Sequence, residues 1–332
     1  MYTLAMQQAV ISLTGMRSNH SHQQPPFMPN PAENDRRERL ELEQIIVFKK
    51  IMPVFQPIVS LDGGRIHGHE SLSRLSHGGS ITNPEELFNK ARKHGLTAEI
   101  EKLCREKALS RASEIGLQGM IFINVCPALL HTEGHRPGFT AELLNHLEID
   151  HSRVVFELTE KTLITDYKLF ERGVAHYRSQ GYRIAIDDLG DGYAGLKMLS
   201  QVVPDYIKLA MFLVSDIDTS RARQALVEAL VCFSKKIGAQ VIAEGIERPE
   251  ELAYFTSIGA EYGQGYLLAR PSHTPSTDHT LDMPDISNLN NGNPVHLQCR
   301  LSKTCCPDNP QVSLSSKFLF DSLEKRRQSK GF

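Results

Sequence analysis

Segments with strand and helix patterns alternate along most of this chain, and this alternation limits the fold more than any other feature. Strands are expected as a pair at 54–61 and 65–71 around the turn Asp62-Gly63-Gly64, then at 120–125, 154–158, 184–187, 206–209, 240–243 and 262–268. Helical spacing of apolar residues is seen at 84–95, 98–115, 139–147, 167–180, 194–199, 220–237 and 249–258. Strands that alternate with helices build parallel sheets. The sequence therefore predicts an α/β fold, a (β/α)8 TIM-like barrel, with an open doubly wound sheet as the alternative.

The two ends of the chain have a different composition. Residues 1–37 are largely polar and contain prolines, which predicts a flexible leader, and a helix is expected at 38–50. The barrel is predicted over residues 38–273, and residues 274–332 are expected to form a low-order polar tail. A metal knuckle in that tail is an open alternative, although the spacing of its ligands fits no standard zinc pattern. The ligands would come from Cys299, Cys305 and Cys306, near His296.

Charge and cysteine usage exclude several classes of protein. The 332 residues include 37 basic and 39 acidic ones, so a net charge of -2 provides no general attraction to a nucleic-acid polymer or an anionic membrane. Six irregularly spaced cysteines do not make a disulfide framework. Residues 1–16 make a poor signal peptide, and no run approaches the roughly 20 apolar residues that span a bilayer. We expect a cytoplasmic protein without a membrane span.

One predicted strand ends in two adjacent carboxylates. The stretch 183–193 continues from an apolar strand into Asp187 and Asp188, with Gly190 following. Adjacent carboxylates repel each other unless cations neutralise them, and oxygen ligands suit magnesium or manganese. Taken alone, the same motif also fits an ordinary solvated turn.

Polar residues end most of the other predicted strands as well. In a parallel barrel, the carboxyl ends of the strands meet at one rim. Several acids placed together there would destabilise the fold without a cation, so a metal centre explains them better than separate solvated side chains. The residues at these strand ends are Glu70, Asn124, Glu157, Asp187, Asp188, Lys208, Glu244 and Gln264.

The motifs and their order resemble the EAL-domain family of cyclic di-GMP phosphodiesterases. The resemblance runs from about Lys50 to Pro271 and includes no part of the two ends. It implies a bacterial enzyme that hydrolyses cyclic di-GMP to linear pGpG, with biofilm formation or motility as the usual outputs. The matching stretches are 55–59, 68–74, 123–125, 157–160, 187–193, 204–208, 243–247 and 264–266.

The resemblance also implies roles for single residues, with two Mg²⁺ or Mn²⁺ ions per site and a homodimer. Glu70, Asn124, Glu157 and Asp187 would ligate one cation, and Asp187 with Asp188 would hold the second. Lys208 and Glu244 would position and deprotonate the attacking water. Gln56, Arg74 and Gln264 would contact the substrate, and Glu160 and Glu247 would brace the loops.

The chain departs from the family pattern without losing a direct ligand. The name-giving motif reads Glu70-Ser71-Leu72. Ala210 stands where an aspartate is common, which removes a carboxylate beside the site. Further departures are Leu75, Leu189, Asp191, Ala194 and Gly195. The alternative is therefore a catalytically impaired cyclic di-GMP receptor or protein-interaction module. Proton abstraction of the enolase type also suits a rim of carboxylates with a lysine, but the order of the motifs argues against it.

Overall fold

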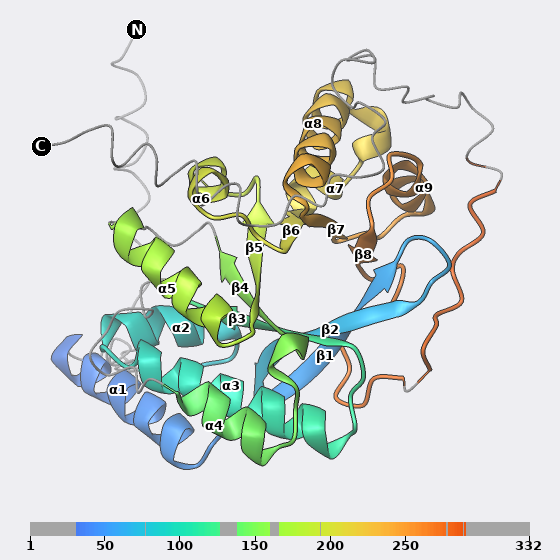
Figure 1. Ribbon diagram of the computed structural model, residues 1–332. Helices are drawn as coiled ribbons and strands as arrows, with labels where there is room; N and C mark the ends of the chain where they lie inside the picture. The colour runs from blue at the N-terminus through green and yellow to red at the C-terminus, as the bar shows by residue number, and fades with distance from the viewer. Residues whose placement is uncertain are drawn as a thin grey trace, which may run out of the picture. The chain divides into compact units, whose positions relative to one another are not determined.

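The computed structural model describes residues 31–76, 78–126, 138–159, 166–192, 194–276, 278–287 and 289 (Figure 1). The chain divides into two compact units, which we describe separately. The first comprises Met1–Met52 with Ser73–Lys107, and the second comprises Pro53–Leu72 with Ala108–Phe332.

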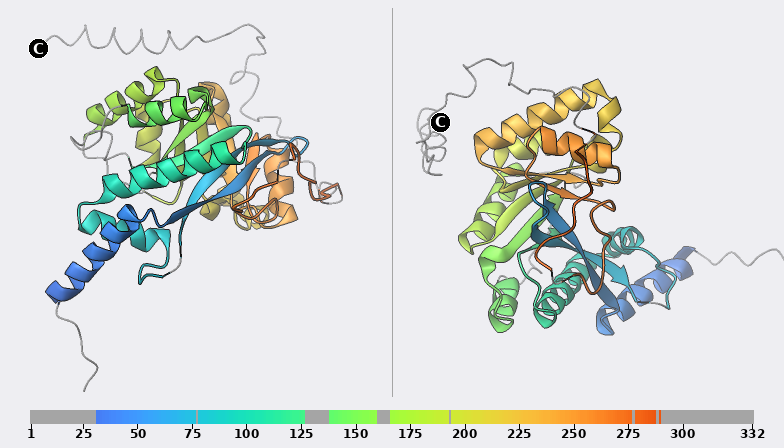
Figure 2. Two further views of the ribbon diagram at one scale, coloured as in Figure 1. Left: turned by 90° about the horizontal axis from the view of Figure 1, so that it is seen from below. Right: turned by 90° about the vertical axis from the view of Figure 1, so that its right-hand side faces the viewer.

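A closed barrel of eight strands, counted over the described residues, confirms the predicted fold class (Figures 1 and 2). Neighbouring strands from β2 to β8 are parallel. Strand β1 departs from the fully parallel pattern and runs antiparallel to β8, because the turn at residues 62–64 returns the chain directly into β2. The strands are β1 Ile51–Ser60, β2 Ile66–Leu75, β3 Met120–Val125, β4 Val154–Thr159, β5 Arg183–Leu189, β6 Tyr206–Leu209, β7 Gln240–Glu244 and β8 Tyr262–Gln264.

Helices follow the strands as the alternation predicted. Helices α5 and α6 contact β5, and α8 contacts β7. Asp166 and Ser220 cap α5 and α8 by accepting hydrogen bonds from the backbone N–H groups of Leu169 and Arg223. The helices are α3 Thr97–Glu114, α4 Phe139–His146, α5 Tyr167–Ser179, α6 Gly195–Gln201, α7 Met211–Val214, α8 Arg221–Ile237 and α9 Pro249–Ser257, with short 3-10 turns η2 His151–Arg153 and η3 Ile217–Thr219.

Two layers of apolar packing hold the second unit together. One small cluster includes Phe122, Tyr206 and Ile242, contributed by β3, β6 and β7. A much larger cluster contains other residues of the strands, such as Ile186 and Val241, together with helix residues such as Phe170 and Val227. Because successive side chains of a strand point to opposite faces, each strand serves both layers.

The first unit contains α1 (Pro31–Val47), α2 (Pro84–Lys93) and the beginning of α3. Its apolar cluster includes Leu42 and Ile45 of α1. Helix α1 begins at Pro31, so residues 31–37, which composition assigned to the flexible leader, are helical. A polar pair four residues apart, in which Asn34 Nδ2 donates to Glu38 Oε1 at 3.2 Å, stabilises the start of this helix, where the sequence has no apolar pattern.

Two further boundaries differ from the prediction. Strand β8 ends at Gln264 rather than at residue 268, because the backbone turns there and the N–H groups of Leu268 and Ala269 both donate to Gly265 O. Part of the predicted polar tail lies along the β1–β2 hairpin, where His279 O accepts from Ile66 N and Leu281 N donates to Gly64 O.

None of the described helices is long and apolar enough to cross a membrane.

Candidate active site

A buried ammonium group stands at the centre of the rim formed by the carboxyl ends of the strands. Lys208 Nζ lies 2.6 Å from Glu157 Oε1, 2.8 Å from Asp187 Oδ1, 2.7 Å from Glu244 Oε1 and 3.3 Å from Glu70 Oε2. The five residues come from β2, β4, β5, β6 and β7. Glu157 is fully buried and Lys208 is 1% exposed, whereas the side chain of Glu244 is 16% exposed.

Three amide side chains extend this cluster. Asn124 Nδ2 donates to Glu70 Oε1 at 3.1 Å and to Glu157 Oε2 at 3.0 Å. Gln264 Nε2 donates to Glu70 Oε2 at 2.8 Å and to Gln56 Oε1 at 3.1 Å. Parallel registry explains the convergence, because Asn124 is level with Glu157 and Glu244 is level with Gln264 across neighbouring strands.

The crowding of acids shifts the proton affinities of the buried groups. Burial, together with the negative charges of Glu70 and Asp187, raises the pKa of Glu157 well above its usual value despite the nearby lysine. Burial also raises the pKa of Glu244 to about 8. Burial alone would lower the pKa of Lys208, but the surrounding carboxylates outweigh it and raise that pKa well above 10.5. The cluster therefore contains acids that bind protons tightly and one firmly charged ammonium.

The backbone is strained at the point where the two aspartates meet. Asp188 has φ +57°, a left-handed conformation that residues other than glycine rarely adopt, and the β5–β6 register shifts between Ile186 and Leu189. Such outliers gather at functional sites because the surrounding structure must hold them. In a regular strand, the side chains of Asp187 and Asp188 would point to opposite faces of the sheet. The register shift between Ile186 and Leu189 interrupts that alternation at the two aspartates.

The structure brings together most of the residues that the sequence singled out. Glu70, Asn124, Glu157, Asp187, Lys208, Glu244, Gln264 and Gln56 form one contact network. Arg74 belongs to the first unit, where its Nη1 donates to Ser73 O at 2.8 Å. The side chain of Glu247 is exposed, and its backbone N–H donates to Glu251. Glu160 lies outside the described residues.

Sequence reasoning missed Glu251, a carboxylate that is 2% exposed and accepts three backbone hydrogen bonds beside the rim. A proline at the first position of a helix followed by an acid at the third, here Pro249 and Glu251, is a known helix-start signal. That signal could have indicated the local role of Glu251, but not its contact with a segment 35 residues earlier.

The donor set fits a hard divalent cation. All candidate ligand atoms are oxygens of carboxylates or amides, which suits Mg²⁺, Mn²⁺ or Ca²⁺ rather than metals that prefer sulfur. Glu157 Oε1 and Asp187 Oδ1 are buried and accept no hydrogen bond of normal geometry, although both lie close to the ammonium. Asn124 would have to turn its amide, because its nitrogen and not its oxygen faces the carboxylates.

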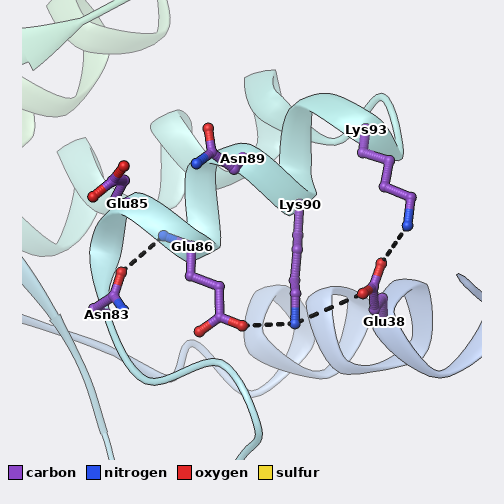
Figure 3. A pocket seen from close by; sticks show the side chains of 7 residues that line it. All are labelled: Glu38, Asn83, Glu85, Glu86, Asn89, Lys90 and Lys93. Atoms are coloured by element: carbon purple, nitrogen blue, oxygen red, sulfur yellow. Dashed lines mark hydrogen bonds and ion pairs between the residues drawn. The ribbon is translucent and has the colours of Figure 1, made fainter. Parts of the chain in front are cut away.

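A second acidic group, in the first unit, is compensated by lysines. Asp35, Glu38 and His94 offer three ligand atoms close together. Lys93 Nζ lies 2.7 Å from Glu38, as Figure 3 shows. It also lies 2.6 Å from Asp35, so one ammonium already balances both carboxylates. The sequence left a metal knuckle open at Cys299, Cys305 and Cys306, and these residues lie outside the described part of the chain.

Two related proteins of Escherichia coli match about two thirds of this chain. Probable cyclic di-GMP phosphodiesterase PdeN of Escherichia coli (strain K12) is 28% identical over 239 residues, which are 70% of this chain and 45% of that protein. The blue light- and temperature-regulated antirepressor BluF of the same organism is 30% identical over 221 residues, or 65% of this chain and 53% of that protein. This chain thus spans about half the length of these two relatives.

Solved structures share the fold. BlrP1 of Klebsiella pneumoniae, in a complex with calcium and cyclic di-GMP, is 31% identical and matches with a TM-score of 0.61 over 67% of this chain and 56% of that chain. The same protein has also been solved with manganese and cyclic di-GMP. The profile of the EAL domain matches residues 39–271, which is most of the present chain. With the closed barrel and its acidic rim, that match shows that this chain belongs to the EAL domain family.

Proposed function

We propose that this chain is a metal-dependent phosphodiesterase that hydrolyses cyclic di-GMP to linear pGpG with two Mg²⁺ or Mn²⁺ ions per site. The observation that carries the proposal is the set of four carboxylates around Lys208 at one rim of the barrel. Relatives named as cyclic di-GMP phosphodiesterases, and a structural neighbour solved with cyclic di-GMP and calcium or manganese, support it.

The acidic rim supplies the ligands that we assign to the cations. Glu70, Asn124, Glu157 and Asp187 would hold one ion, and Asp187 with Asp188 would hold the other. When bound, such ions would neutralise phosphate oxygens and promote ionisation of the attacking water. Because the pKa of Glu157 is raised well above its usual value without them, cation binding must displace a proton or the Lys208 ammonium from the carboxylates.

Glu244 and Lys208 are assigned to the proton transfer. A general base works best when its pKa is near the working pH, and the pKa of Glu244 is about 8. Its Oε1 atom lies 2.7 Å from Lys208 Nζ, so we assign the water proton to Oε2. One bond forms between phosphorus and the water oxygen as one bond to a ribose oxygen breaks, and the released ribose oxygen takes up a proton from solvent to become a hydroxyl.

The remaining assignments concern recognition and assembly. We assign Gln56, Gln264 and Arg74 to the substrate, the last because a guanidinium fork suits phosphate oxygens. Glu160 and Glu247 are assigned to bracing the loops. A homodimer is proposed on the family resemblance, and the exposed apolar side chains of Leu196 (74% exposed) and Phe212 (61% exposed) on α6 and α7 offer contact area for it.

A binding module without turnover is the second candidate. Ala210 follows Lys208 by two residues and is 2% exposed, so no carboxylate is available at this buried position. BluF, at 30% identity, carries the name of an antirepressor, which is a regulatory function. This candidate predicts nucleotide binding without product.

The test is incubation of the purified protein with cyclic di-GMP and Mg²⁺ or Mn²⁺, with chromatography of the products and an EDTA control. We expect metal-dependent pGpG from the wild type and none from Glu70→Gln, which removes a carboxylate of the rim. Glu114→Gln, at an exposed position of α3, serves as the control and should keep full activity. Binding without product would favour the second candidate, and unchanged turnover in Glu70→Gln would refute the metal assignment.

A further inference from the structure

The loop that follows β7 is fixed by one buried carboxylate. Glu251, in the first turn of α9, is 2% exposed. Its Oε2 atom accepts hydrogen bonds from the backbone N–H groups of Glu247 at 2.9 Å and Arg248 at 3.1 Å. These contacts tie the loop directly to the start of the helix and leave that oxygen fully engaged.

The other oxygen of Glu251 reaches a different loop. Oε1 accepts a hydrogen bond at 2.9 Å from the backbone N–H of Asp216, in the segment that follows β6 and α7. Asp216 has φ +51°, so its backbone must be held in a left-handed conformation. A carboxylate that only started its own helix would not need this contact. Glu251 therefore joins the two connections that leave β6 and β7.

Ion pairs on the solvent side reinforce the same junction. Arg248 Nη1 lies 2.5 Å from Asp216 Oδ1, and Nη2 lies 3.1 Å from Asp218 Oδ2. The Arg248 side chain is 37% exposed, so we expect these pairs to contribute little by themselves. The buried carboxylate is the stronger link, because its loss would leave three N–H groups without a partner.

Close packing limits how far the loop after β7 can move. A Cβ atom on Gly245 would lie 2.6 Å from Met211 Cγ of α7. On the other side, Ile246 N donates to Gln264 O at 3.0 Å and Leu267 N donates to Ile246 O at 3.1 Å. The loop is therefore held between α7 and the turn after β8, immediately beyond Glu244.

From these contacts we infer that Glu251 is a positioning residue for the Lys208–Glu244 pair. Lys208 stands near the end of β6 and Glu244 ends β7, and strand pairing aligns them only as far as Leu209 with Ala243. Beyond that point, Glu251 is a buried carboxylate that joins the two following loops. The inference rests on the proposed function, in which the pair receives the water proton.

The expected effect is on turnover rather than on substrate binding. The hydrogen bonds that Glu251 makes with described residues go to the backbone of the two loops and not to the rim, so its loss changes where Glu244 stands and not which groups bind the nucleotide. A displacement of about 1 Å at a reacting group can lower the rate by about 100-fold. We expect Glu251→Ala to lower kcat by about 10-fold or more while KM changes by less than about 3-fold. Glu251→Gln, which keeps one carbonyl acceptor, should recover part of the loss.

Glu228→Ala is the matched control. Glu228 accepts a hydrogen bond at 3.0 Å from Tyr254 OH and so links α8 to the same helix α9. Among the described residues, this bond does not reach the loop after β6 or the loop after β7. Both variants remove a carboxylate that anchors α9, so general loosening of the helix would affect them alike. Only the positioning role predicts a selective fall of kcat in Glu251→Ala.

The test combines steady-state kinetics with amide hydrogen exchange. The kinetics use cyclic di-GMP and Mn²⁺ and compare the wild type with Glu251→Ala, Glu251→Gln and Glu228→Ala. Faster exchange at Asp216, Glu247 and Arg248 in Glu251→Ala, together with the selective fall of kcat, is the expected result. If the wild type turns over and Glu251→Ala matches it, or Glu228→Ala loses kcat equally, the positioning role is wrong and the proposed function stands. An inactive wild type overturns both.

Discussion

Replacement of Glu244 by glutamine is expected to stabilise the metal-free protein and to abolish turnover. The glutamine keeps the shape of the side chain and a carbonyl that can accept from Lys208 Nζ, now 2.7 Å from Glu244 Oε1. It removes one negative charge from a rim where four carboxylates share one ammonium. Stability and activity should therefore change in opposite directions, as is common where like charges are gathered for function.

The magnitude follows from the pKa of Glu244, which burial raises from 4.5 to about 8. Between these pH values the native state binds more protons than the unfolded state, so its stability falls as the pH rises. At pH 7 the carboxyl costs about 3 kcal/mol of unfolding free energy, and at pH above 8 about 5 kcal/mol. At pH 5 the cost is below about 1 kcal/mol.

Urea unfolding in EDTA at pH 5, 7 and 8.5 measures this difference between Glu244→Gln and the wild type. The advantage of the variant should grow with pH over this range. Added Mn²⁺ should narrow the difference, because Glu244→Gln keeps every carboxylate that we assign to the cations and bound cations would offset the repulsion within the rim of the wild type. A variant that is less stable than the wild type at pH 8.5 in EDTA, or a difference independent of pH, would refute the electrostatic reasoning.

Two further substitutions test the rim and its support. Lys208→Met leaves buried carboxylates without the ammonium that balances them. In EDTA at pH 7 the variant should therefore lose about 3 to 5 kcal/mol of unfolding free energy, and it should lose less at pH 5. An equal loss at both pH values would contradict this. Gly245 has φ +71°, and an added Cβ atom would lie 2.6 Å from Met211 Cγ. Gly245→Ala should therefore lower both stability and kcat. Its control is Gly238→Ala, at φ +76° with open space around the added carbon, which should cost only about 1 kcal/mol and leave kcat unchanged.

The periodicity of the sequence was sufficient for the barrel because each strand and helix carries its own local signal. Runs such as Ile184 to Ile186 are apolar, short and bounded by the charged residues Arg183 and Asp187. Boundaries were less predictable where tertiary contacts set them. The polar start of α1 has no apolar pattern, and β8 ends at Gln264 because the chain turns at Gly265 to pack against the loop after β7.

The sequence by itself determined which residues could form the site. Polar residues at successive strand ends must meet if the strands are parallel, and the order of the motifs identified the family. Nothing in that order indicated that Lys208 would lie within 2.8 Å of three carboxylates, since the distance depends on strand registry and on which way each side chain points.

Only the tertiary structure decided the electrostatics and the support of the site. The raised pKa of Glu244 arises from burial and from charges on other strands, so no local pattern contains it. The same holds for Glu251, whose helix-start position is visible in the sequence but whose bond to Asp216 exists only because the loops after β6 and β7 are neighbours. Local signals fix the elements, whereas contacts between residues distant in sequence fix the proton affinities and the geometry of the site.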